Sequence, residues 1–100
     1  MTTVYLLDAV TVDTVGTPVA GIGGGKVIQV SSVDFGGGSV TIEGRLDTGL
    51  EWTVLTYGGN PAVFTTNVIL KLDFWAATMY LRATLSGSTT PSAVSVALSD

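Results

Sequence analysis

The chain has 100 residues, a net charge of −4, and neither histidine nor cysteine. This length fits one domain over residues 1–100, and four scattered basic residues give no electrostatic footprint for nucleic acid. The lack of cysteine excludes disulfides and thiolate metal sites, and no apolar run reaches the roughly 18 residues that a membrane span requires.

Short runs of alternating apolar residues follow one another along the whole chain. Val, Thr and Ile make up a third of the residues, and 13 glycines supply turns between the runs. Because the runs are short and the turn signals regular, we expect an all-β domain, an antiparallel sandwich or barrel of about eight strands. In chain order the expected strands cover 4–15, 26–33, 39–46, 51–57, 63–73, 78–85 and 92–98. The first of these runs is either one long strand or two strands with a bend near Asp8.

The same alternation predicts connections and a core. The segment 86–91 is expected to be a hairpin loop, and 73–78 is the one segment that favours a helical turn. The side chains expected in the core are Val30, Ile42, Val54, Leu81, Ala83, Val94 and Val96.

The residues available for catalysis are few. Without histidine, the commonest general base at neutral pH is missing, together with any Ser-His-Asp arrangement. Glu43 and Glu51 lie on neighbouring expected strands, but a domain of this size has little room for a cleft between two buried acids. The glycines before Lys26 do not form a phosphate-binding loop, since Ala20 and Val27 replace its first glycine and its hydroxyl residue. We therefore expect no enzyme activity and no catalytic, cofactor-binding or metal-binding residues.

The segment 45–52 resembles the Asp-box, a Ser-x-Asp-x-Gly-x-x-Trp pattern on hairpins of sialidases and other secreted β proteins. Asp47, Gly49 and Trp52 match the pattern, whereas Arg45 replaces its serine. Asp47 is expected to accept hydrogen bonds from turn amides, Gly49 to take a positive φ, and Trp52 to cover the hairpin. We interpret these three residues as turn-forming, with a glycan-binding surface as the alternative.

Aromatic and glycine-rich segments are the candidates for contact with another protein chain. The segments 21–25 and 34–38 are expected to become ordered only against a partner, because glycine keeps most backbone conformations open. Trp75, or Phe74 if the strand register shifts by one residue, is expected to be the buried anchor beside both loops. A place in the core and a sugar-stacking surface are the alternatives for this aromatic pair. The candidate interface residues are therefore Trp75, Phe74, Gly23, Gly24 and Gly37.

The shortage of charge predicts assembly. Only 12% of the residues are charged, about half of the usual share, which favours a surface partly covered by other chains and hence a homo-oligomer. Over its whole length the chain resembles the small structural proteins of tailed-phage virions, through its Met-Thr-Thr start, its Val/Thr/Gly-rich strands and the segments 40–47 and 80–87. The resemblance implies a jelly-roll-like β-sandwich and a head-decoration (cement) protein that cross-links major capsid subunits, with a trimer favoured over a dimer.

The expected location is the virion, after synthesis in the host cytoplasm. The N-terminus lacks the basic region and the long apolar stretch of a signal peptide. Neither nucleic acid nor a membrane is expected as a partner. Two alternative functions stay open from the sequence, a carbohydrate-binding module and a phage tail or fibre component.

Overall fold

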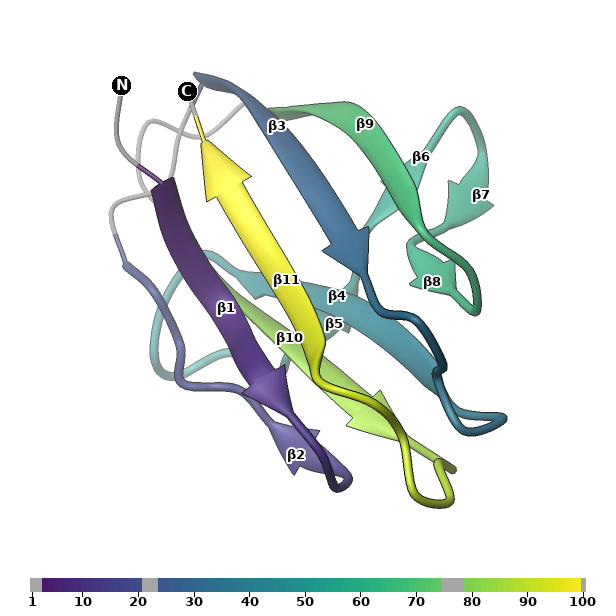
Figure 1. Cartoon of the computed structure of the whole chain (residues 1–100). Coiled ribbons are helices and arrows are strands. Elements are labelled where there is room, and N and C mark those ends of the chain that lie inside the picture. The colour runs from purple at the N-terminus through teal and green to yellow at the C-terminus, as the bar shows by residue number, and fades with distance from the viewer. Residues whose placement is uncertain (1–2, 21–23, 75–78, 100) are drawn as a thin grey trace.

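All secondary structure in the described part of the chain is β-strand. The computed structural model describes residues 3–20, 24–74 and 79–99, and Figure 1 shows their arrangement. Six strands have six to eight residues: β1 (Thr3–Val10), β3 (Gly24–Ser31), β4 (Ser39–Arg45), β9 (Val68–Phe74), β10 (Tyr80–Ser86) and β11 (Val94–Ser99). Five strands have two residues: β2 (Thr14–Val15), β5 (Thr53–Val54), β6 (Thr56–Tyr57), β7 (Asn60–Pro61) and β8 (Val63–Phe64).

The all-β prediction is confirmed, while the strand count differs from the expected eight. The described residues form eleven strands, because the expected runs 4–15, 51–57 and 63–73 are each divided in two and β7 lies outside the expected runs. The helical turn expected over 73–78 is wrong at its start, since Asp73 and Phe74 belong to β9. Residues 75–78 of that segment lie outside the described residues.

Two large antiparallel sheets contain most of the strands. One has four strands in the order β1-β11-β3-β9, and the other has five, in the order β2-β10-β4-β5 with β8 also paired to β4. The hairpin of β6 and β7 forms a small sheet of its own. The pairing is nested: β1 pairs with β11, β2 with β10, β3 with β9, and β4 with β5 and β8. The chain therefore crosses between the two sheets at most of its long connections (Figure 1).

The segment 86–91 is one of these crossings, so the expected hairpin loop is wrong. It leaves β10 in the five-stranded sheet and enters β11 in the four-stranded sheet. The neighbours of β10 are β2 and β4, and those of β11 are β1 and β3. Alternation and turn residues predicted two strands and a loop, but the partner of each strand lies far away in the sequence.

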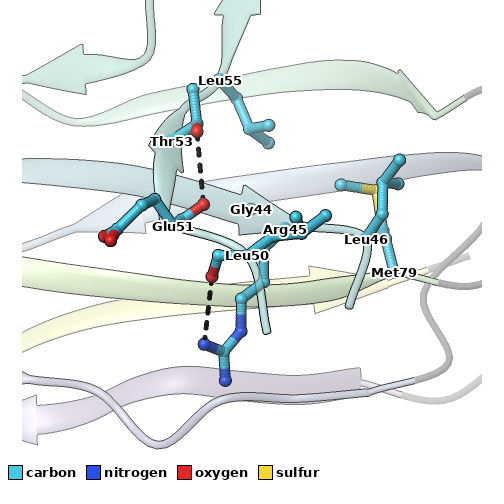
Figure 2. Close-up of a pocket in the computed structure, with 8 residues that line it drawn as sticks. All are labelled: Gly44, Arg45, Leu46, Leu50, Glu51, Thr53, Leu55 and Met79. Atoms are coloured by element: carbon cyan, nitrogen blue, oxygen red, sulfur yellow. Dashed lines mark hydrogen bonds between the residues drawn. The ribbon is translucent and has the colours of Figure 1, made fainter. Parts of the chain in front are cut away.

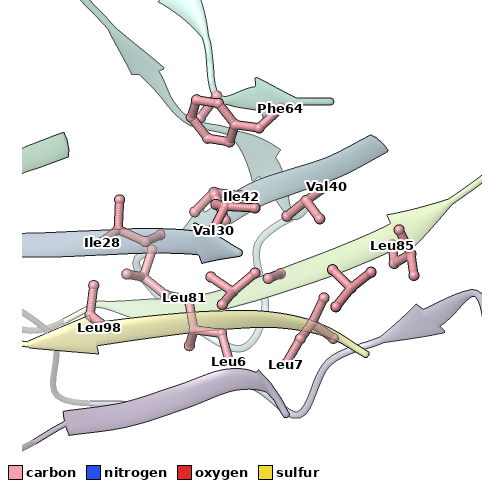
Figure 3. Close-up of a cluster of buried hydrophobic side chains, with 14 of the residues drawn as sticks. Leu6, Leu7, Ile28, Val30, Val40, Ile42, Phe64, Leu81, Leu85 and Leu98 are labelled. Atoms are coloured by element: carbon pink, nitrogen blue, oxygen red, sulfur yellow. The ribbon is translucent and has the colours of Figure 1, made fainter. Parts of the chain in front are cut away.

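The core lies between the inward faces of the two large sheets (Figure 3). Buried and half-buried positions alternate along β4 and β10, as expected for strands with one face toward a core. Val54 was expected in the core, but 38% of it is exposed, because it pairs with Glu43 on the outward face of β4. The six other expected core residues are fully buried: Val30, Ile42, Leu81, Ala83, Val94 and Val96.

A bulge in β1 lets two consecutive leucines enter this core. Leu6 and Leu7 are both buried, and the register with β11 shifts on either side of Leu7. Ala9 has a φ of 52°, and its amide donates to the Ser95 hydroxyl at 2.9 Å. A left-handed residue within a bulge changes the direction of the strand. The regular ladder of β1 is thereby interrupted about midway.

The glycine-rich segment 34–38, which we expected to become ordered only against a partner, makes several contacts within the chain. The Gly36 amide donates to Asp34 Oδ1 at 2.7 Å, and the Thr89 amide donates to the Gly36 carbonyl at 2.8 Å. A Cβ at Gly36 would lie 2.4 Å from the Thr89 carbonyl oxygen. Glycine is therefore needed here for close approach to the chain's own crossing segment.

The same crossing segment is tied to the turn between β1 and β2 by a carboxylate. Asp13 accepts hydrogen bonds from the amides of Gly87 at 3.1 Å and Ser88 at 3.0 Å, and from the Ser88 hydroxyl. The Ser88 hydroxyl is the main cause that lowers the Asp13 pKa below its ordinary value of 3.8. Hydrogen bonds to the charged form stabilise it relative to the protonated form.

The lowered Asp13 pKa predicts a pH-dependent contribution to stability. Because the folded state favours the carboxylate, the contribution is complete above the ordinary pKa of 3.8 and is lost as the pH falls through the lower folded pKa. Asp13→Asn should lower the urea midpoint of unfolding at neutral pH, and the difference from the unmodified protein should shrink as the medium is acidified toward about pH 2. A difference that stays constant with pH would contradict the assignment.

The inward face of β10 can be tested by truncation. Leu81→Ala removes a fully buried side chain between the two sheets, and we expect it to lower the free energy of unfolding by about 2–5 kcal/mol. Leu46→Ala is the matched control, because Leu46 is 61% exposed, and its effect should stay within about 0.5 kcal/mol. Urea unfolding followed by circular dichroism measures both, and equal effects would show that the inward face is misassigned.

Candidate functional site

The structure separates the interface residues expected from the sequence. Gly24 is the first residue of β3 and pairs with Phe74, the last residue of β9. Gly37, which has a φ of 76°, lies in the connection that follows the other end of β3. The two glycine-rich segments therefore cannot flank one common anchor. Gly23 and Trp75 lie outside the described residues.

The turn after β4 is closed by Asp47. The Leu50 amide donates to the Asp47 carbonyl at 3.0 Å, and the Gly49 amide donates to Asp47 Oδ1 at 3.2 Å. Gly49 has a φ outside the left-handed region, contrary to expectation. The carboxylate, rather than a special glycine conformation, thus sets the shape of this turn.

Arginine side chains flank the tryptophan that follows the turn. The Cζ atoms of Arg45 and Arg82 lie 4.4 Å and 4.5 Å from the centroid of the Trp52 ring, within the range of cation–π attraction. Arg45 also donates through Nη1 to the carbonyls of Thr48 at 3.2 Å and Leu50 at 3.4 Å. The residue that departs from the Asp-box pattern therefore connects the turn to Trp52.

Glu43 is engaged on the same outer face of the five-stranded sheet. It pairs with Arg82 at 3.1 Å and accepts the Thr84 hydroxyl at 3.3 Å. The Arg82 and Glu43 side chains are 24% and 17% exposed, which leaves the pair partly covered. Glu43 was one of the two acids considered from the sequence as a catalytic pair. Its carboxylate is held by the Arg82 guanidinium and the Thr84 hydroxyl.

A mainly apolar pocket of about 380 Å³ opens beside this turn. Figure 2 shows Leu55 and Met79 around Gly44, and a Cβ at Gly44 would meet both side chains. A Cβ at Gly44 would lie 2.8 Å from Met79 Cε, so glycine keeps this wall close to the core. The full lining consists of Gly44, Arg45, Leu46, Leu50, Glu51, Thr53, Leu55 and Met79. Such a lining suits an apolar group better than a charged one.

The outer face of the four-stranded sheet is broad and carries little charge. We call it the front face, because this sheet lies in front in Figure 1. Strand register places eight outward-facing residues of this sheet in two rows. One row is Tyr5, Ala97, Gln29 and Ile69, and the next is Thr3, Ser99, Val27 and Lys71. Tyr5 is 53% exposed and Ile69 is 65% exposed, so each of the two outer strands of this sheet presents a large apolar side chain to solvent.

Sequence reasoning did not identify Tyr5 and Ile69 as members of one surface. The alternation within each strand was visible, since Val27 and Gln29, like Ile69 and Lys71, are two residues apart. The signal that was missing is the cross-strand register, which joins positions 5 and 69 through two intervening strands.

The described residues contain no group of three or more His, Cys, Asp or Glu side chains that could hold a metal ion. Within the same residues, no helix has the length and apolar character needed to cross a membrane. The candidate binding features of the described residues include an apolar pocket, an Arg–Trp cluster and a weakly charged sheet face. These features suit binding to a surface or to an apolar group.

The Arg45–Trp52 contact can be followed by fluorescence. In a Trp75→Phe background, Arg45→Ala should expose the Trp52 ring to acrylamide and increase quenching, because one of its two guanidinium neighbours is lost. The free energy of unfolding should fall by about 0.5–1 kcal/mol. Lys71→Ala, a change on the other sheet, is the control and should leave quenching unaltered. Unchanged quenching in Arg45→Ala would show that the contact does not persist in solution.

Comparison with known proteins does not assign this chain to a family. No family model, no curated protein and no solved structure matches it. Functional inference therefore depends on the geometry described above and on the resemblance stated from the sequence.

Proposed function

We propose that the chain is a virion structural protein, of the capsid-decoration type, that attaches to other protein chains through its front face. The nested pairing of β1 with β11, β2 with β10, β3 with β9 and β4 with β8 supports a jelly-roll β-sandwich. That order results when one long antiparallel ribbon wraps around a core, and viral capsid and lectin domains are built in this way. The strand order supports the fold part of the proposal; the surface supports the function.

The observation that carries the proposal is the front face. Its two rows hold eight residues, of which Lys71 is the charged one, and they expose Tyr5, Val27 and Ile69. Interface centres are depleted of charge and enriched in aromatic side chains. The opposite outer face also exposes apolar side chains, Val15, Val54 and Val63. It differs in its charged contacts, since Arg82 pairs with Glu43 and Arg45 lies over Trp52. The low charge of the front face is therefore what favours it as the contact surface.

The size of the front face suits a repeated contact. Two rows across four strands cover roughly 300 Å², whereas a stable interface between two proteins buries about 800 Å² on each partner. A single contact through this face would be weak. Many copies on one symmetric shell would hold together by avidity, because each bound copy raises the effective concentration for the next contact.

The carbohydrate-binding alternative has one specific observation in its favour. Trp52 is partly exposed beside Arg45, Arg82 and Tyr80, and aromatic rings with neighbouring hydrogen-bond donors stack on sugar rings. However, two guanidinium groups already occupy positions near the ring centroid. The front face lacks this competition, so we place the principal contact there.

The proposed function can be tested by binding to shells. Capsid shells from a mutant phage that lacks this gene would be mixed with the purified protein and sedimented. The unmodified protein should saturate the shells, and Tyr5→Lys should bind about tenfold more weakly, because a charge enters an otherwise apolar contact. Val12→Lys is the matched control, since Val12 is 66% exposed but lies outside the front face.

Two results would contradict the proposal. Absence of the protein from sedimented shells would reject the virion function. Binding to an oligosaccharide array that disappears in Trp52→Ala and persists in Tyr5→Lys would favour the carbohydrate-binding alternative.

A further inference from the structure

A polar pocket of about 470 Å³, separate from the one at Gly44, lies between two connections at one end of the four-stranded sheet. One connection follows β3 and the other precedes β9 (Figure 1). Because Val30 near the end of β3 pairs with Val68 at the start of β9, both connections leave the sheet at the same end. We call this hollow the loop pocket. Its lining consists of Ser32, Val33, Asp34, Phe35, Thr65, Thr66 and Asn67.

Hydrogen bonds within the chain hold the walls of the loop pocket in place. The Ser32 amide donates to Asn67 Oδ1 at 2.8 Å, which joins the two connections directly. The Asp34 amide donates to Ser32 Oγ at 3.1 Å, and the Ser92 amide donates to the Asp34 carbonyl at 2.8 Å. These contacts involve the backbone of both walls. The pocket therefore exists before a ligand arrives, and binding does not have to order it.

The polar groups of the loop pocket include both donors and acceptors. Asp34 accepts the Gly36 amide through Oδ1 at 2.7 Å, so its Oδ2 is a further acceptor for a ligand. Since Asn67 accepts through Oδ1, its Nδ2 group is a donor. Thr65 and Thr66 are exposed, and each hydroxyl both donates and accepts. A ligand with neighbouring hydroxyl groups matches this set.

Apolar side chains complete the lining. Phe35 is 8% exposed and Val33 is 95% exposed, so one lies at the base of the β3–β4 connection and the other extends into solvent. A sugar ring carries hydroxyl groups around its edge and C–H groups on its faces. Apolar walls with a few polar groups bind such a ligand through both kinds of surface.

The same lining disfavours other classes of ligand. Asp34 is the one charged residue in the lining, and its charge repels phosphate and other anions. A calcium site generally combines several carboxylates, whereas this pocket offers one. A purely apolar ligand would cover the carboxylate and the hydroxyls without giving them partners, which is costly.

We propose that the loop pocket binds a neutral sugar. Asp34 accepts from one hydroxyl group of the sugar, Asn67 donates to a neighbouring one, and Val33 contacts a C–H face of the ring. This site is distinct from Trp52, which lies on the outer face of the other sheet. It goes beyond the proposed attachment to shells, because its residues lie outside the two rows of the front face.

Nuclear magnetic resonance titration of the ¹⁵N-labelled full chain tests the proposal. The probes are glucose, galactose, mannose and N-acetylglucosamine, with their disaccharides. At least one should shift the amide signals of residues 32–35 and 65–67, with a dissociation constant of about 1 mM. Asp34→Asn keeps an Oδ1 for the Gly36 amide but replaces the second oxygen with a donor, so it should weaken binding about tenfold.

Hydroxyl removal supplies a matched control. The double variant Thr65→Val/Thr66→Val keeps the side-chain shapes and should also weaken binding about tenfold, because the pocket loses two hydrogen-bonding groups. Thr56→Val makes the same change on β6, outside the pocket, and should leave the affinity unaltered. Circular dichroism melting establishes that each variant is folded.

Four results would overturn the proposal. They are the absence of shifts with every sugar, shifts centred on Trp52, full affinity in Asp34→Asn, and shifts at the pocket with calcium chloride or sodium phosphate but not with sugars. Sugar binding at the pocket by a protein that does not sediment with shells would reject the proposed function and keep this inference. Attachment to shells without any sugar binding would do the reverse.

Discussion

The pairing of β11 with two strands at once holds the four-stranded sheet together. The last strand of the chain lies between β1 and β3, so the first strand has no other ladder partner in the described residues. Its side chains Val94, Val96 and Leu98 are also buried between the sheets. The fold therefore depends on contacts between the two ends of the sequence. Such contacts require closure of the whole chain before they contribute, which slows folding and makes it cooperative.

The same central strand gives the front face its character. On the outward side β11 presents two small side chains, Ala97 between Tyr5 and Gln29, and Ser99 between Thr3 and Val27. The opposite sheet has a different outer face, where Glu43, Arg82 and Trp52 contact one another. The outer face of the five-stranded sheet thus carries contacts between charged and aromatic side chains, whereas the two rows of the front face are mostly uncharged. A domain built in this way is suited to contact through one side.

Hydrogen bonds within the chain, which has no disulfides, connect the loops at one end of the domain. Asp13 holds the crossing segment at Gly87 and Ser88, and Gly36 allows Thr89 to approach within hydrogen-bonding distance. These contacts join loops that lie far apart in the sequence but at the same end of the domain. These glycines and polar residues therefore serve the chain itself, and the surfaces left for other molecules are the front face and the loop pocket.

The sequence alone determined the class of the fold and part of the core, because alternation with a period of two is a local property of each strand. Ile42 and Leu81 could be placed inward from their neighbours alone, and both are fully buried. Val54 could not, because its face is set by pairing with Glu43 rather than by its own run. The cluster of Arg45, Arg82 and Trp52, like the row from Tyr5 to Ile69, joins strands whose partners are distant in sequence. Register between such strands depends on packing of the whole domain, so only the tertiary structure decided which surfaces exist.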